Sequence, residues 1–131
     1  MPDGIYIPKV GLGYAPAYQV SGIPYCTASM TIAASTSDPT ILEFPSVTKS
    51  VTIFNPNANQ VHVSISLNGM NNNRYAVVTA NNGSLTWDVK VKDIFLRNSA
   101  ASPTTVNVLA ELTGIERNNL PNNWTGSVGV G

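Results

Sequence analysis

Hydrophobic and polar residues alternate along most of the chain between residues 25 and 113. The clearest example is VHVSISL, in which Val61, Val63, Ile65 and Leu67 alternate with three polar residues. A period of two is typical of a β-strand that buries one of its faces. The same kind of pattern predicts strands in seven further stretches: residues 25–33, 40–44, 46–54, 74–79, 84–91, 93–97 and 104–113.

Turn-forming residues separate these strands roughly every 8 to 12 residues. NPNANQ at 55–60 and ANNG at 80–83 combine asparagine with proline or glycine, and the Asn-Gly pair is suited to a hairpin. No window predicts a helix longer than a turn. The pattern therefore predicts an all-β fold with about eight strands, built as a sandwich or barrel of antiparallel sheets.

The alternation also assigns side chains to the core. In residues 25–33 it places Cys26, Ala28, Met30 and Ile32 on one face, so the single cysteine is expected to be a buried, unreactive residue. In residues 46–54 the phase changes near Lys49, which predicts a break in the strand register there.

The two ends of the sequence have a different composition. Residues 1–24 are rich in glycine, proline and tyrosine, which excludes a regular helix but leaves much apolar surface to bury. We expect an extended arm over residues 1–24, a sandwich domain over 25–115 and an extended tail over 116–131. The apolar residues of the arm and tail predict an interface with a partner chain, formed by Tyr6, Tyr14, Pro16, Tyr18, Leu120 and Trp124. The alternative is that the arm folds back and covers an edge of its own sandwich.

Composition narrows the possible partners. A length of 131 residues fits one domain, and charged residues make up 11% of the chain with a formal net charge of zero. Little electrostatic repulsion then opposes association between copies. The seven lysine and arginine residues form no basic cluster, so nucleic acid is not an expected partner. Neither a secretion signal nor an apolar membrane span is recognisable in the sequence, so we expect no export by that route and no membrane partner.

Residues that could carry chemistry are few. His62 is the single histidine and sits on the polar face of its strand, where we interpret it as a surface or interface residue. Asp88 and Asp93 alternate with Lys90 and Lys92, which favours charge pairs between strands or edge protection over a metal site. GLGYAP at 11–16 lacks the third glycine of a phosphate-binding loop. We therefore predict no cofactor, no metal and no enzymatic activity.

Asparagine-rich stretches leave two interpretations open. NGMNNN at 68–73 and ANNG at 80–83 could contact sugars, because amides both donate and accept hydrogen bonds. Turn formation explains the same residues, and we favour it. Two matches to the glycosylation acceptor pattern, at 82–84 and 123–125, are expected by chance in a chain of this composition.

Four phrases of the sequence resemble small virion structural proteins of tailed bacteriophages, in particular jelly-roll decoration or cement proteins of the capsid. They are SGIPYCTAS, FPSVTKSVTIFNPNANQVHVSISLNG, VKVKDIFLRNS and VNVLAELTGI, within residues 21–115. The resemblance implies a jelly-roll-like sandwich without enzymatic activity that binds the outer surface of a shell, often as a trimer. It implies the major capsid protein or other virion proteins as partners, and a location in the virion after assembly in the host cytoplasm. The alternatives are a receptor- or glycan-binding knob of a fibre or tail, and a tail or connector adaptor.

Overall fold

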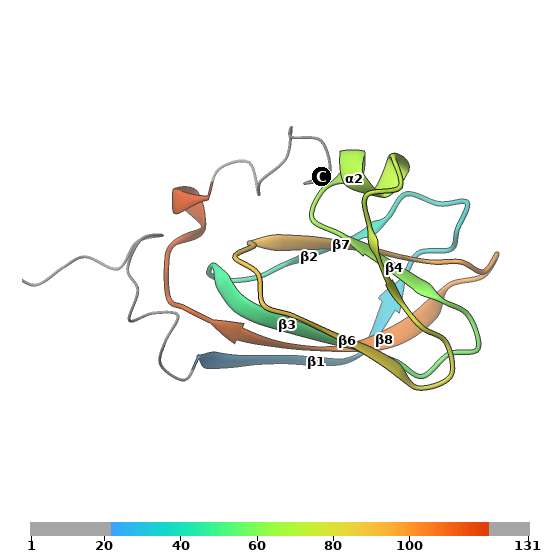
Figure 1. Cartoon of the computed structure of the whole chain (residues 1–131), viewed down its shortest axis with the longest axis horizontal. Coiled ribbons are helices and arrows are strands. Elements are labelled where there is room, and N and C mark those ends of the chain that lie inside the picture. The colour runs from blue at the N-terminus through green and yellow to red at the C-terminus, as the bar shows by residue number, and fades with distance from the viewer. Residues whose placement is uncertain (1–21, 121–131) are drawn as a thin grey trace, which may run out of the picture.

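The computed structural model describes residues 22–120, and these contain eight strands and two short helices (Figure 1). In chain order the elements are β1 (Ile23–Ile32), β2 (Thr40–Glu43), β3 (Thr48–Asn55), β4 (Val61–Ser64), α2 (Leu67–Asn71), β5 (Ala76–Val78), β6 (Gly83–Trp87), β7 (Asp93–Asn98), β8 (Thr104–Leu112) and the 3₁₀ helix η2 (Arg117–Asn119). The predicted all-β fold with about eight strands is therefore confirmed.

The strands form two four-stranded sheets, with the orders β1-β8-β3-β6 and β2-β7-β4-β5. Every strand pairing within them is antiparallel. β4 pairs with β5, β3 with β6, β2 with β7 and β1 with β8, so each pair encloses the one before it. This nesting is that of one long hairpin rolled up over itself, which is the jelly-roll arrangement. The expected antiparallel sandwich with jelly-roll topology is confirmed.

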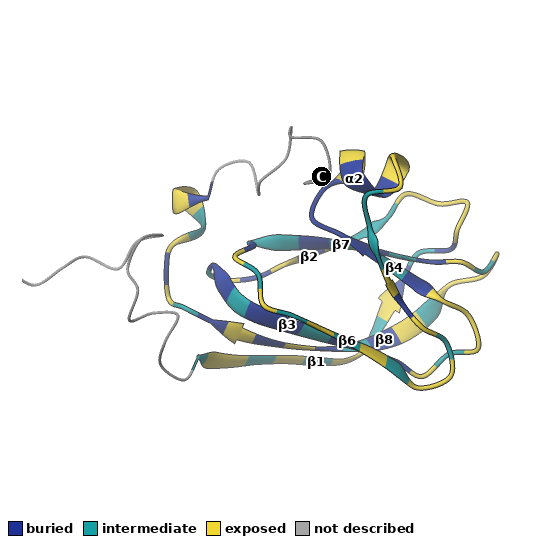
Figure 2. Cartoon of the chain, viewed as in Figure 1, coloured by how far each residue is buried: buried dark blue, intermediate teal, exposed yellow. Residues whose placement is uncertain are grey.

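The core lies between the two sheets and is made mostly of aliphatic side chains, with Phe44 among them. Buried residues alternate with more exposed ones along many of the strands (Figure 2). On β8 the predicted inward residues Val106, Val108, Ala110 and Leu112 are all buried. In the predicted strand 84–91, Leu85, Trp87 and Val89 pack against the core as the pattern predicted, although β6 ends at Trp87. Each fully buried aliphatic side chain contributes roughly 1.5–3 kcal/mol to folding.

A β-bulge in β1 makes the core assignment of that strand wrong in its first half. The register with β8 shifts between Thr27 and Met30, and Ser29 has a φ of 53°. The Ser29 N–H donates to the side-chain oxygen of Asn107 at 2.8 Å. One extra residue inverts the alternation, so Tyr25 packs against the core before the bulge and Ile32 after it, while Cys26 is exposed.

The strand predicted over residues 61–67 ends early, at Ser64. The Ser66 hydroxyl accepts from the Gly69 N–H at 2.9 Å and thereby caps the short helix α2, where the sequence pattern indicated only a turn. Leu67 is consequently 48% exposed instead of facing inward, and Met70 fills the core position at 1% exposure.

The ANNG stretch is a turn but not the predicted hairpin, because β5 and β6 belong to different sheets. Asn81 and Asn82 adopt left-handed backbone angles, with φ of 58° and 69°. A Cβ atom at Gly83 would collide with the backbone oxygen of Thr79, so this crossing between the sheets requires glycine. By contrast, the break expected near Lys49 is confirmed as a register shift between Thr48 and Ser50.

Candidate docking groove

The outward side chains of the sheet β1-β8-β3-β6 form rows across its strands. Pairing places Glu111 of β8 between Pro24 of β1 and Ser50 of β3. In the adjacent row, Leu109 lies opposite Thr52, which in turn lies opposite Thr86 of β6. This face of the sheet therefore carries hydroxyl, carboxylate and apolar groups in register.

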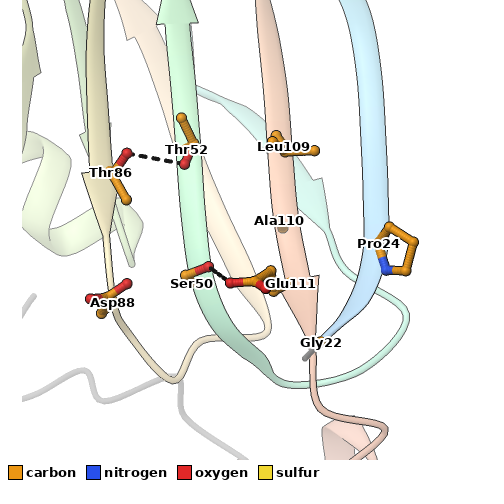
Figure 3. A pocket seen from close by; sticks show the side chains of 9 residues that line it. All are labelled: Gly22, Pro24, Ser50, Thr52, Thr86, Asp88, Leu109, Ala110 and Glu111. Atoms are coloured by element: carbon orange, nitrogen blue, oxygen red, sulfur yellow. Dashed lines mark hydrogen bonds between the residues drawn. The ribbon is translucent and has the colours of Figure 1, made fainter. Parts of the chain in front are cut away.

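These rows line a shallow groove of about 320 Å³ (Figure 3). Its lining residues come from all four strands and the segments next to them: Gly22, Pro24, Ser50, Thr52, Thr86, Asp88, Leu109, Ala110 and Glu111. Leu109 is 50% exposed and offers the largest apolar side chain in this set. The groove therefore combines a few apolar side chains with hydrogen-bonding groups, and both can contact a bound chain.

Hydrogen bonds fix the polar side chains of the groove. The Ser50 hydroxyl donates to the Glu111 carboxylate at 2.8 Å, and the hydroxyls of Thr52 and Thr86 lie 3.1 Å apart. The bond from Ser50 lowers the pKa of Glu111 below its ordinary value of 4.5, and burial opposes this shift. The positive charge of Lys49 and the Gly22 N–H lower the same pKa further. Glu111 is therefore ionised at neutral pH.

His62 lies on the outer face of the other sheet, half-buried on β4. Its ring stacks on that of Tyr75, with centroids 4.1 Å apart and planes inclined by 16°. Arg97 of β7 and Val77 of β5 lie opposite it in the two neighbouring strands. Burial, followed by the charge of Arg97, lowers the pKa of His62 from 6.5. A stacked, neutral ring beside a guanidinium fits the predicted surface or interface histidine.

The predicted partner residues Tyr6, Tyr14, Pro16, Tyr18 and Trp124 lie outside the described residues. Leu120 is described, and at 3% exposure it is buried in its own chain. Its side chain therefore leaves almost no surface open to a partner in this structure.

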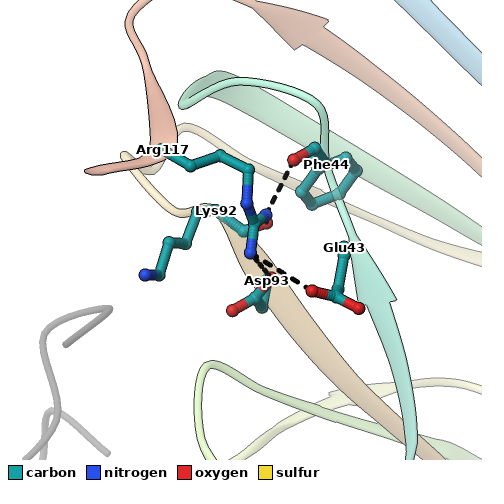
Figure 4. A network of polar contacts seen from close by, with 5 residues as sticks. All are labelled: Glu43, Phe44, Lys92, Asp93 and Arg117. Carbon is teal, nitrogen blue, oxygen red and sulfur yellow. Dashed lines mark hydrogen bonds and ion pairs between the residues drawn. The ribbon is translucent and has the colours of Figure 1, made fainter. Parts of the chain in front are cut away.

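The start of the predicted tail is held against the sandwich by Arg117, a residue that the sequence reasoning did not single out (Figure 4). One guanidinium nitrogen donates to the backbone oxygens of Phe44 and Lys92, both at 2.7 Å. The other lies 2.8 Å from Asp93 and 3.4 Å from Glu43. The two buried apolar residues that flank this segment, Ile115 and Leu120, were the signal in the sequence that could have placed it on the sandwich.

The charge-pair interpretation of the Asp88–Asp93 stretch is only partly reflected in the structure. Asp93 pairs with Arg117, which comes from the segment after β8 and not from a neighbouring strand. Asp88 is exposed and lines the groove on the outer face of the sheet.

Several asparagine side chains organise turns by bonding to nearby backbone. Asn55 is fully buried; its amide donates to the backbone oxygens of Asn59 and Thr79, and its oxygen accepts from the Asn57 N–H. In the stretch 68–73, the Asn72 amide donates to the backbone oxygen of Asn68 at 2.7 Å. These contacts favour the turn-forming interpretation at these positions.

Among residues 22–120, no group of three or more histidine, cysteine or acidic side chains is placed to hold a metal ion. Within the same described range, no helix has the length and apolar character needed to cross a membrane. No family model, curated protein or solved structure matches this chain. The fold and the surfaces above are therefore what supports an assignment of function.

Proposed function

We propose that this chain is a non-enzymatic structural protein of a virion, a decoration protein that binds the outer surface of a phage shell. Its partners are the major capsid protein or other virion proteins, together with further copies of itself in a trimer. The segments before Gly22 and after Leu120 carry the contacts with these partners.

The observation that carries this proposal is the nested jelly-roll sandwich, formed by a chain in which only 11% of the residues are charged and the formal net charge is zero. Jelly rolls of eight strands recur in viral coat proteins and in lectin domains. The chain enters the sandwich at Gly22, on the outer face of the sheet β1-β8-β3-β6, and leaves it near β2 and β7, where Arg117 contacts Glu43 and Asp93. Apolar segments attached at two separate places allow one sandwich to join two neighbours, and many copies make modest contacts sufficient.

Immunogold labelling of intact particles, from cultures in which the chain is produced, tests the location. Label spread over the capsid surface is the expected result. Particles without label, with the chain remaining in the cell fraction, would overturn the proposal. Label confined to tail tips would instead indicate the knob or the adaptor.

A truncation tests the role of the leading segment. The variant lacking residues 1–21 should fold but should no longer join the particles, whereas substitution of the exposed Val77 by alanine should leave incorporation unchanged. Incorporation of the truncated variant at the full level would contradict a role for this segment.

The glycan-binding knob remains the second candidate, because the groove presents hydroxyl and carboxylate groups that sugars can bond. A glycan array separates the two functions. A decoration protein should show no selective binding, and a reproducible hit that is lost in Thr86→Val would favour the knob.

A further inference from the structure

We propose that residues 16–21 of this chain, Pro-Ala-Tyr-Gln-Val-Ser, lie across the groove on the outer face of their own sheet β1-β8-β3-β6. This inference deepens the proposed function. It rests on that function only in assigning residues 1–15 to the contact with a partner. The leading segment thus has a proximal part that docks on its own sandwich and a distal part that docks elsewhere.

The position of Gly22 shows from which side the chain reaches the sheet. A Cβ atom at Gly22 would lie 2.5 Å from the Cβ of Glu111, whose side chain points outward from β8. The Gly22 N–H also hydrogen-bonds to the Glu111 carboxylate. Gly22 therefore lies above the outer surface of the sheet and itself lines the groove (Figure 3). The residues just before it start from the groove and not from the core.

The width of the sheet fixes how much chain the groove takes. Neighbouring strands lie about 4.8 Å apart, so the path from β1 to β6 across the sheet spans roughly 14 Å. An extended chain advances about 3.3 Å per residue, so about five residues cross the groove. Counting back from Gly22, a crossing of this length reaches Ala17 in the sequence.

The side chains of this segment match the groove. In an extended chain Tyr18 and Val20 project to the same side. Val20 lies close to Gly22 in sequence, which puts Pro24 and Leu109 within its reach. Tyr18 then lies over β3 and β6, where the hydroxyls of Thr52 and Thr86 and the carboxylate of Asp88 offer partners for a phenol.

The segment is also covalently tied to the edge of the groove. A short tether gives it an effective concentration on the order of millimolar, which a separate copy or a foreign peptide reaches only at high concentration. The segment of the same chain is therefore the occupant to which we assign the groove.

Disulfide trapping in the full-length chain tests this assignment without any shell or partner. In a Cys26→Ser background, Val20→Cys is combined with Leu109→Cys, and in a matched control with Val77→Cys on the outer face of the other sheet. Mild oxidation of dilute protein should give an intramolecular disulfide in the first variant and at least tenfold less in the control. Equal cross-linking in both variants, or dimers alone, would overturn the proposal.

A second measurement covers the case in which the engineered disulfide fails to form for geometric reasons. In the Cys26→Ser background, the thiol of Leu109→Cys should react with a soluble thiol reagent several-fold more slowly in the full chain than in the chain lacking residues 1–21. Equal rates would overturn the proposal. Because both measurements use the isolated protein, they can fail while incorporation into particles still holds, and the reverse.

Discussion

At the scale of single residues, buried polar groups define how the strands and connections fit together. Thr48 is fully buried at the start of β3, and its hydroxyl donates to the Val89 oxygen at 2.7 Å and accepts from the Val91 N–H at 3.1 Å. Its own N–H donates to the Val91 oxygen at 2.9 Å. These three bonds hold the connection from β6 to β7 against β3, where regular strand pairing has ended.

Replacing Thr48 by valine keeps the shape of the side chain but removes the hydroxyl. The buried Val91 N–H then lacks its partner, and we expect the free energy of unfolding to fall by about 1–3 kcal/mol. Denaturant titration measures this change. Thr48→Ser retains the hydroxyl and should lose only about 0.8 kcal/mol for the missing methyl group. A valine variant as stable as the serine variant would show that these bonds contribute nothing.

His62 gives the sandwich a pH dependence in the mildly acidic range. Its folded pKa is lowered, so the unfolded chain binds the proton more readily. The stability contributed by the neutral ring is complete above the ordinary pKa of 6.5 and is lost as the pH falls below it, through the folded value. The melting temperature should therefore fall between pH 6.5 and 5, and less so in His62→Gln. An identical pH profile for the two proteins would contradict this assignment, since the Glu111 transition lies below pH 4.5.

At the scale of elements, the alternation in the sequence predicted most strands, because one face of each sheet packs on the core and the other faces outward. β2, β7 and β8 and the inward faces of the β6 stretch follow from it. It could not predict the bulge at Ser29, because an inserted residue changes which face is inward without changing the composition of the strand. The end of β4 could not be predicted for a related reason. Hydrophobic and polar residues go on alternating up to Leu67, although the Ser66 side chain already caps a helix there.

The candidate groove was less accessible from the sequence than the fold. Leu109, Thr52 and Thr86 become neighbours only through pairings between strands that are far apart in the chain. Each of them is a single outward residue on its own strand, so the sequence pattern did not indicate that they share a surface. The expected interface residues came instead from composition, and five of those six lie outside the described residues.

The bulge in β1 makes Cys26 accessible, because it places the thiol on the outer face opposite Leu109. A thiol reagent should therefore modify Cys26 stoichiometrically in the folded protein, at a rate similar to its reaction with a small thiol compound. Mass spectrometry of the native and the denatured protein measures this directly. Modification only after denaturation would mean that Cys26 faces the core after all.

Arg117 fastens the segment after β8 to the ends of β2 and β7. We expect Arg117→Ala to lower the stability by about 2 kcal/mol, because the backbone oxygens of Phe44 and Lys92 lose a charged donor. Thermal unfolding measures the loss. Arg117→Lys should recover only part of it, since an ammonium group lacks the planar fork.

The two ion pairs of Arg117 should differ in weight. Glu43 is 72% exposed, whereas Asp93 is 18% exposed and lies closer to the guanidinium. Glu43→Gln should therefore change the stability by less than about 0.5 kcal/mol. A larger loss in Glu43→Gln than in Asp93→Asn would contradict this ranking.

At the scale of the whole molecule, all eight strands of residues 22–120 lie between Ile23 and Leu112, so the sandwich should not need residues 1–21 to fold. A chain lacking them should retain a single cooperative unfolding transition and the β-rich circular dichroism spectrum. A chain lacking residues 1–27 also loses half of β1 with Tyr25, which packs edge-on against Phe44 at 5.2 Å, and should be markedly less stable. Unfolding of the shorter truncation would place residues 1–21 within the folded unit.

The nesting of the strand pairs has a consequence for the synthesis of this protein. β1 is among the first described segments to leave the ribosome, yet its partner β8 ends only at Leu112, and the same strand also completes the pairing of β3. Until β8 is made, β1 has no strand partner and β3 can pair only with β6, so the sheet stays divided during most of translation. Such long-range pairing folds slowly. Until β8 emerges, the nascent chain exposes unpaired strands that neighbouring chains on a polysome could capture.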